Sequence, residues 1–326
     1  MRVLVTGANG FVGRALLDRL ATSADFEPIA SIRSDSMPDR PEKLKVVRTT
    51  GLQSDTDWSD ALDQVSVVIH CASRVHVMND RETDPLGVYR SVNVEGTLNL
   101  ARQAVNKGVR RFIFLSSIKV NGESTRLNQP YTADTSPAPV DPYGISKLEA
   151  EQGLREIAAH SAMEVVIIRP TLVYGPGVKA NFLNMMRWLN RGVPLPFGAI
   201  DNRRSLVALA NLVDVVVVCI THPAAVNQTF LVSDGEDLST TQLLVRMGHV
   251  LGKPARLLPV PSWLLELGAT LLGKKSLSQR LCGSLQVDIT KTRELLGWNP
   301  PVSVDDALIL TANCFLEKEK QYYQNA

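Results

Sequence analysis

Two short segments of the chain carry side chains that together can move a proton. In residues 142–147, PYGISK, Tyr143 and Lys147 lie four positions apart at the start of a predicted helix, so both project from one helix face. A phenol has an ordinary pKa of about 10, and a nearby ammonium favours the phenolate. We therefore expect Lys147 to lower the pKa of Tyr143 toward neutral pH, so that Tyr143 acts as a general acid or base.

A predicted strand at residues 112–117, FIFLSS, ends in the hydroxyls of Ser116 and Ser117. Doubly wound sheets bind ligands at the carboxyl ends of their strands, which places Ser117 where it can hydrogen-bond a reacting oxygen. A Tyr and a Lys at this spacing more often mark only a solvated helix face. Their order in the chain, after a glycine turn and the strand-end serines, favours a catalytic unit of Ser117, Tyr143 and Lys147.

The glycine turn lies at residues 6–13, TGANGFVG, between a predicted strand and a predicted helix. Gly7 permits a tight turn, Gly10 lets the backbone approach a pyrophosphate, and Gly13 allows close helix packing. The helix N-terminus attracts phosphate. These observations predict a dinucleotide site, whose contacting residues are Gly7, Asn9, Gly10, Phe11, Val12 and Gly13.

The second predicted strand ends in Ser31-Ile32-Arg33. Dinucleotide folds place an acidic residue near this point to bind the ribose 2′-hydroxyl, whereas an Arg accommodates a 2′-phosphate. Because a guanidinium pairs with phosphate in a two-pronged fashion, Arg33 favours NADP. Asp35 is close enough in sequence to bind the ribose instead, so we expect NADP or NAD as the cofactor.

Short apolar runs alternate with amphipathic stretches through the first half of the chain, a βαβ pattern. The runs lie at residues 3–5, 28–32, 45–47, 65–69, 112–115 and 165–168. Continuous apolar strands need cover on both faces, which predicts an α/β fold with a doubly wound parallel (Rossmann) sheet over residues 1–170. The turn-rich remainder, residues 171–326, predicts a smaller, mostly helical substrate domain, with a segment at about 205–235 returning to the first domain.

Composition narrows the partners of the 326-residue chain. The net charge of +2, without a basic run, gives no field that favours nucleic acid. The apolar stretches are shorter than the roughly 18 residues of a membrane span. The chain opens on a predicted strand and not on a predicted signal peptide. Its four cysteines form no C-x-x-C pair. We expect a cytoplasmic protein without membrane insertion, and no metal site, because His70 and His76 lack partners at ligand spacing.

Five segments occur in the order typical of extended short-chain dehydrogenases/reductases, which the chain resembles in its nucleotide-sugar epimerase/dehydratase branch. They are residues 6–13, 93–97 (NVEGT), 116–117, 143–147 and 169–170. The resemblance implies that Ser117 is the catalytic hydroxyl, Tyr143 the acid or base, and Lys147 the residue that binds nicotinamide ribose. It further implies cofactor contacts at Cys71, Ala72, Asn93, Ser116 and Pro170, and contacts to the diphosphate of a nucleotide sugar at Asn181, Arg204 and Arg280. A homodimer formed through a helix pair is usual among the proteins it resembles.

Two positions depart from that pattern. The chain has Val120-Asn121-Gly122 where relatives often carry Val-Tyr-Gly, so a customary aromatic near the substrate is missing. It has Gly51-Leu52 where many carry Gly-Asp, which removes an acidic contact to adenine. Neither change affects the proton-transfer unit.

The resemblance, and in particular residues 74–78 and 116–123, leads us to expect reduction of a 4-keto group on a UDP-linked 2-acetamido-hexose, as in N-acetylquinovosamine formation. A 4-epimerase with tightly bound NAD uses the same residues and remains an alternative. A 4,6-dehydratase is disfavoured, because those relatives place Asp-Glu after the catalytic Ser or Thr and this chain has Ile118-Lys119. A non-catalytic NADP-sensing protein is an alternative of another class, although such proteins commonly lack the Tyr and Lys. We expect the apolar stretch at residues 263–272 to pack as a helix within the second domain.

Overall fold

The computed structural model describes residues 1–33, 44–75, 84–271, 273, 279 and 281–324. Asp35, His76 and Arg280, which sequence analysis singled out, lie outside the described residues.

The apolar runs form one parallel sheet in the order β3-β2-β1-β4-β5-β6-β9. Its strands are β1 (Arg2–Thr6), β2 (Glu27–Ile32), β3 (Lys45–Arg48), β4 (Val67–His70), β5 (Arg111–Leu115), β6 (Glu164–Pro170) and β9 (Thr229–Val232). The order reverses beside β1, so the ends of β1 and β4 lie next to each other, with Thr6 opposite His70. Such a switch point is where open α/β sheets bind their ligands.

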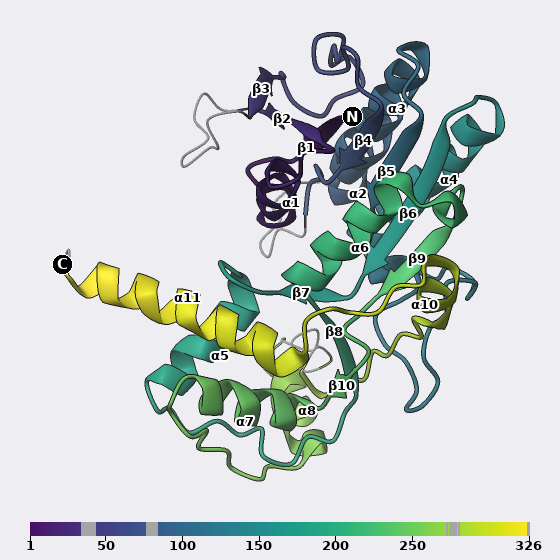
Figure 1. Cartoon of the computed structure of the whole chain (residues 1–326). Coiled ribbons are helices and arrows are strands. Elements are labelled where there is room, and N and C mark those ends of the chain that lie inside the picture. Colours follow the sequence, from purple (N-terminus) through teal and green to yellow (C-terminus); the bar gives the residue numbers. More distant parts are fainter. Residues whose placement is uncertain (34–43, 76–83, 272, 274–278, 280, 325–326) are drawn as a thin grey trace.

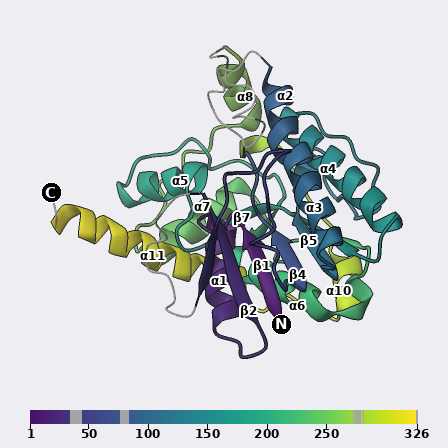
Figure 2. The same ribbon diagram turned by 90° about the horizontal axis from the view of Figure 1, so that it is seen from above.

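Helices cover both faces of this sheet because successive strand residues point to opposite sides. Val3 and Val5 of β1 face a core shared with α1 (Phe11–Ala21) and α6 (Leu209–Thr221). Leu4 faces the other core, shared with α3 (Thr97–Asn106) and α4 (Pro142–Ala159). The short helix α2 (Pro85–Tyr89) and a π-helical turn, η1 (Arg90–Gly96), lead into α3. Figure 2 shows the two helical layers on either side of the strands. The prediction of a doubly wound parallel fold is confirmed.

A second, smaller unit lies below the main sheet in Figure 1. Its three strands run in the order β10 (Asp237–Leu238), β8 (Arg204–Ala208) and β7 (Leu172–Tyr174). Three helices share its core: α5 (Ala180–Asn190), α7 (Thr240–Val250) and the start of α11 (Val304–Gln324), which projects from the body of the molecule. Within residues 205–235, α6 packs on the main sheet and β9 pairs with β6 in it, while β8 belongs to the small sheet. The helix α10 (Thr290–Leu296) returns to the main domain beside β9.

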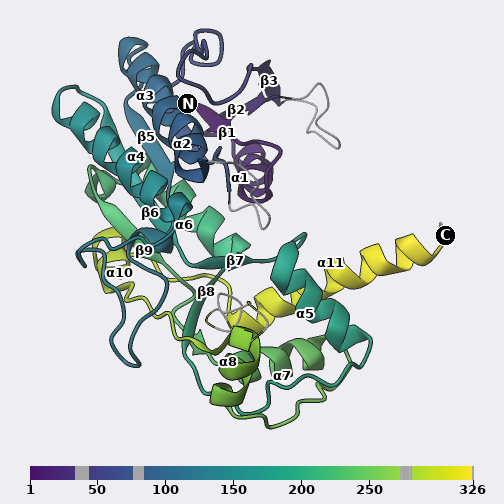
Figure 3. The same cartoon turned by 180° about the vertical axis from the view of Figure 1, so that it is seen from behind.

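One packing prediction is wrong. Residues 262–271 form a helix, α8 (Ser262–Leu271), but none of its side chains is buried. Trp263 is 62% exposed and Leu271 is 79% exposed, because neighbouring elements leave this helix largely uncovered. Figure 3 shows the helix in the view from behind the molecule. Among the helices that the structure describes, none combines the length and the apolarity that a bilayer span requires.

Candidate active site

The glycine turn joins β1 to α1 and has little room for side chains. Gly7 has a φ of +68°, and a Cβ added there would lie 2.7 Å from the Ala72 amide nitrogen. A Cβ on Gly13 would lie 2.2 Å from the Gly7 carbonyl oxygen. On Gly10, the same atom would meet the Gly7 oxygen at 3.0 Å and no other described atom beyond its chain neighbours within 4 Å. Backbone atoms therefore fill the space next to Gly7 and Gly13, whereas the space next to Gly10 is open. This open space lies beside the start of α1 and fits the pyrophosphate of a dinucleotide.

The end of β4 is fastened to this turn through His70. Its Nδ1 lies 2.7 Å from the Thr6 hydroxyl, and its Nε2 lies 2.9 Å from the Thr97 hydroxyl. The Ala72 amide donates to Thr6 Oγ1 at 3.3 Å. Burial lowers the pKa of His70 to about 3, so the ring is neutral and structural. Across the described residues, no cluster of three His, Cys, Asp or Glu side chains suits a metal ion.

Asn93 and Arg33, both predicted to contact the cofactor, lie in η1 and after β2. Asn93 is buried in η1, where its amide accepts from the Arg74 amide nitrogen at 2.7 Å and donates to Ser146 Oγ at 3.0 Å. It therefore ties the segment after β4 to α4. Arg33 is exposed at the end of β2, the strand that pairs with β1. Cys71 and Ala72 are half-buried after β4, and Pro170 is buried at the end of β6.

The predicted proton-transfer residues meet near the N-terminus of α4. Asp141 caps this helix by accepting the Gly144 amide at 2.7 Å, and Pro142 occupies its first turn. The hydroxyls of Ser73 and Ser117 lie close enough to the half-buried Tyr143 phenol to lower its pKa. Ser73 was not among the predicted site residues, although its place three residues after the end of β4 was a usable signal.

Lys147 is buried and aimed at the strand that carries the serines. Its Nζ donates to the Leu115 carbonyl at 2.9 Å and lies 4.5 Å from the centroid of the Phe114 ring. The same nitrogen is 5.8 Å from the centroid of the Tyr143 ring. The structure thus brings together Ser117, Tyr143 and Lys147, with Ser73 added.

The expected effect of Lys147 on Tyr143 is wrong. Burial, and after it the Asp141 carboxylate, raise the pKa of Tyr143 to about 12, and the two serine hydroxyls only partly oppose this. Burial also lowers the pKa of Lys147 to about 8. Because the ammonium hydrogen-bonds Leu115 and not the phenol, desolvation dominates. At neutral pH Tyr143 is a protonated phenol, ready to donate, and Lys147 is an ammonium.

The remaining predicted residues lie in different surroundings. The Ser116 hydroxyl donates to the buried Glu151 carboxylate at 2.6 Å. Asn181 is half-buried in the first turn of α5. Arg204 begins β8 and donates to the Gly283 carbonyl at 2.9 Å. Both therefore belong to the smaller unit, while the proton-transfer residues belong to the main domain.

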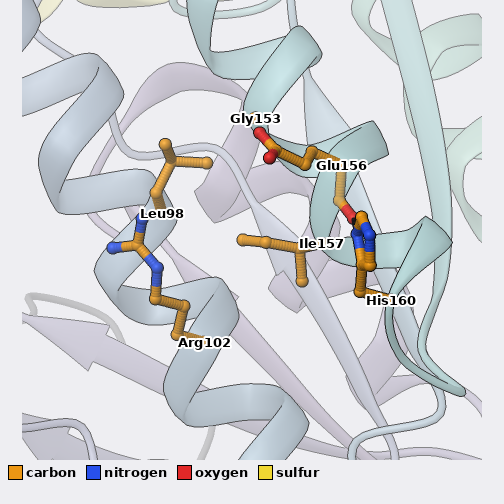
Figure 4. Close-up of a pocket in the computed structure, with 6 residues that line it drawn as sticks. All are labelled: Leu98, Arg102, Gly153, Glu156, Ile157 and His160. Atoms are coloured by element: carbon orange, nitrogen blue, oxygen red, sulfur yellow. Dashed lines mark hydrogen bonds between the residues drawn. The ribbon is translucent and has the colours of Figure 1, made fainter.

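A separate hollow of about 230 Å³ lies between α3 and α4 (Figure 4). Its lining residues are Leu98, Arg102, Gly153, Glu156, Ile157 and His160. At 1.5 Å per residue, Glu156 is about 20 Å along α4 from Tyr143, so this hollow is not part of the catalytic group.

Comparison with known proteins decides the family. The NAD dependent epimerase/dehydratase family matches residues 3–233, a stretch that contains the glycine turn and the proton-transfer residues. The chain belongs to this family. A UDP-glucose 4-epimerase of Vibrio cholerae is 49% identical over 316 residues, covering 97% of this chain and 95% of the relative.

Solved structures of the NAD-dependent epimerase/dehydratase type share the fold. A UDP-glucose 4-epimerase from Thermotoga maritima with UDP-glucose is 22% identical, with a TM-score of 0.77 and coverage of 98% of this chain and 100% of that one. A UDP-glucuronic acid 4-epimerase from Bacillus cereus in complex with NAD is 20% identical, with a TM-score of 0.75 and coverage of 99% and 100%. Family membership confirms the predicted resemblance, the enzyme class and the nicotinamide dinucleotide cofactor.

Proposed function

We propose that this enzyme transfers a hydride at C4 of a UDP-linked hexose. The observation that carries the proposal is the Tyr143 phenol, kept protonated by burial, with the Ser117 hydroxyl beside it and the Lys147 ammonium on the same helix face. The 49% identical relative, named as a UDP-glucose 4-epimerase, supports both the sugar carrier and the reacting carbon.

The chain's residues have distinct roles in this reaction. The glycine turn would hold the nicotinamide cofactor, which when bound would accept or donate the hydride. For reduction of a C4 ketone, Tyr143 gives its proton to the C4 oxygen, so the alcohol forms and a phenolate remains. Ser117 hydrogen-bonds the same oxygen, and the Lys147 ammonium stabilises the phenolate. Oxidation of the alcohol uses the same residues in reverse, with Tyr143 as the base.

Our first candidate for the overall reaction is net reduction, in which C4 of a 4-keto-2-acetamido-hexose receives the hydride. It is supported by Arg33, which is exposed at the end of β2 where a 2′-phosphate of NADP would need a cation. Asn181 and Arg204 of the smaller unit are proposed to hold the diphosphate of the sugar nucleotide.

A 4-epimerase is the second candidate, and the Vibrio cholerae relative favours it. An epimerase oxidises C4 and then returns the hydride to the opposite face, so its NAD is regenerated in every cycle and can stay bound.

One experiment separates the two directions. The purified enzyme is denatured, and any released nucleotide is identified by mass spectrometry. Retained NAD, with UDP-glucose converted to UDP-galactose without added cofactor, supports the epimerase. A nucleotide-free enzyme that consumes NADPH with a UDP-4-keto-hexose supports the reductase, and failure of both assays refutes C4 hydride transfer on a UDP-hexose.

We also propose that the enzyme works in the cytoplasm, as its composition leads us to expect, and as a homodimer, as the resemblance implies. Cell fractionation and analytical ultracentrifugation test these two points.

A further inference from the structure

A lysine contacts both segments that carry the proposed proton-transfer hydroxyls. Lys119 belongs to η2 (Ile118–Val120), a single turn of 3-10 helix after β5. Its backbone amide donates to Ser117 Oγ at 3.3 Å, so Ser117 caps this turn. Because the serine oxygen accepts this bond, its own hydrogen can be directed to another acceptor, such as the C4 oxygen. The main chain of Lys119 therefore orients the Ser117 hydroxyl.

The side chain of Lys119 reaches the helix that carries Tyr143. Its Nζ donates to the Asp141 carboxylate and, at 2.7 Å, to Glu123 Oε1. The other oxygen of Asp141 accepts the Gly144 amide and caps α4. The side chains of Lys119, Glu123 and Asp141 are only 22%, 26% and 19% exposed, so water and salt screen these contacts less than those of a surface ion pair.

Two backbone contacts bring η2 and the start of α4 together. The Ala138 amide, just before α4, donates to the Val120 carbonyl at 3.0 Å. A Cβ added to Gly144 would lie 2.9 Å from the Lys119 carbonyl oxygen, so the first turn of α4 approaches η2 closely. The pair of Lys119 and Asp141 therefore joins two segments that already touch, and it can fix their relative position.

The residue at position 119 also marks a departure in the sequence. Ile118-Lys119 stands where the dehydratases that the chain resembles carry Asp-Glu. A carboxylate at position 119 would repel the carboxylates of Glu123 and Asp141, whereas the ammonium attracts both. In this chain the position therefore fastens η2 to α4.

We propose that Lys119 is a positioning residue for the proton-transfer unit: it joins the turn that Ser117 caps to the helix that carries Tyr143. The separation of the two hydroxyls then depends on this link. The proposal rests on the function proposed above, in which both hydroxyls bond the C4 oxygen. A misplacement of about 1 Å can slow a reaction by on the order of 100-fold, so a loosened link is expected to slow the chemical step.

Steady-state kinetics of Lys119→Met test this role. Methionine retains an unbranched side chain and removes the ammonium. We expect kcat to fall by on the order of 10- to 100-fold while the KM for the UDP-hexose stays within a few-fold, because the link aligns reacting groups. Lys119→Arg keeps a cation and should recover most of kcat. Lys291→Met is the matched control and should leave kcat unchanged, since Lys291 pairs with the exposed Asp134 in another part of the surface.

A second variant shows whether Lys119 acts through the helix cap. Asp141→Asn keeps an oxygen for the Gly144 amide and removes the charge that Lys119 binds. If the two residues act as one link, the double variant should be no slower than the slower single variant. Losses in kcat that multiply in full would show that Lys119 does not act through Asp141, and they would overturn the proposal.

Hydrogen exchange followed by mass spectrometry gives a readout that needs no substrate. In folded Lys119→Met, peptides that cover residues 117–123 and 141–147 should exchange faster by on the order of tenfold, whereas peptides of β8 should not change. Unchanged exchange in both peptides overturns the proposal. So does a kcat per folded enzyme that stays normal while only the Tm falls, since Lys119 would then be purely structural. If the unaltered enzyme transfers no hydride to a UDP-hexose, the proposed function fails, and the exchange rates still decide whether Lys119 holds the two segments together.

Discussion

Replacing Arg33 with Asp tests how the enzyme chooses its cofactor. Arg33 is exposed at the end of β2, and β2 pairs with β1, whose end carries the glycine turn. A guanidinium there can pair with the 2′-phosphate of NADPH, which NADH lacks. The Asp variant removes that pairing, adds repulsion toward the phosphate, and offers a carboxylate to the free 2′-hydroxyl of NADH.

The magnitude follows from the kind of bond and its exposure. Hydrogen bonds to charged groups contribute about 1.5 to 3 kcal/mol, which corresponds to roughly a tenfold to hundredfold difference in affinity. Because Arg33 is exposed, solvent screens the pairing, and we expect the lower end, about a tenfold loss for NADPH. The affinity for NADH should be unchanged or improved.

Fluorescence titrations with NADPH and NADH measure both affinities. Arg256→Asp, an exposed Arg of the smaller unit, is the charge-matched control and should change neither. If the two affinities change together in Arg33→Asp, or if neither changes, Arg33 is a surface residue and the argument for a reductase loses its main physical support.

Two further predictions concern the glycine turn and the lysine. Gly10→Val should abolish cofactor binding in a calorimetric titration, because its side chain fills the open space at the turn. Gly268→Val on α8, where an added Cβ would meet nothing within 4 Å, should bind the cofactor normally. Undiminished affinity in Gly10→Val would refute the pyrophosphate contact. Burial lowers the pKa of Lys147 to about 8, so the lysine is charged below that pH and kcat should fall as the pH rises through it. A kcat that stays constant well above pH 8 would show that the ammonium is not required.

Structural features that depend on local sterics or on a fixed residue spacing could be predicted from the sequence. Gly7 and Gly13 are required by contacts of 2.7 and 2.2 Å that any Cβ would make, so the glycine pattern predicted the turn directly. Tyr143 and Lys147 lie on one helix face because of their spacing alone. The alternation of apolar runs and helices likewise predicted the parallel sheet.

Features that depend on distant segments could not be predicted in this way. The pKa of Tyr143 is set by its burial and by Asp141, and the direction of the Lys147 side chain is set by the Leu115 carbonyl. Ser73 follows β4 and Tyr143 lies in the first turn of α4, so only the fold brings them together. The exposure of α8 depends on which elements surround it, and its apolar sequence gave the opposite expectation.

The role of Tyr143 is the central claim, and a single-turnover measurement tests it most directly. The enzyme with its nicotinamide cofactor is mixed with a UDP-hexose substrate, and the absorbance of the reduced nicotinamide reports hydride transfer. Tyr143→Phe keeps the ring and removes the acidic proton, so hydride transfer should slow by on the order of 100-fold or more while the affinities for cofactor and UDP stay unchanged. Tyr131→Phe, which removes a phenol that bonds the Ser124 carbonyl, should react at the normal rate. A rate in Tyr143→Phe within a few-fold of the unaltered enzyme would contradict the account.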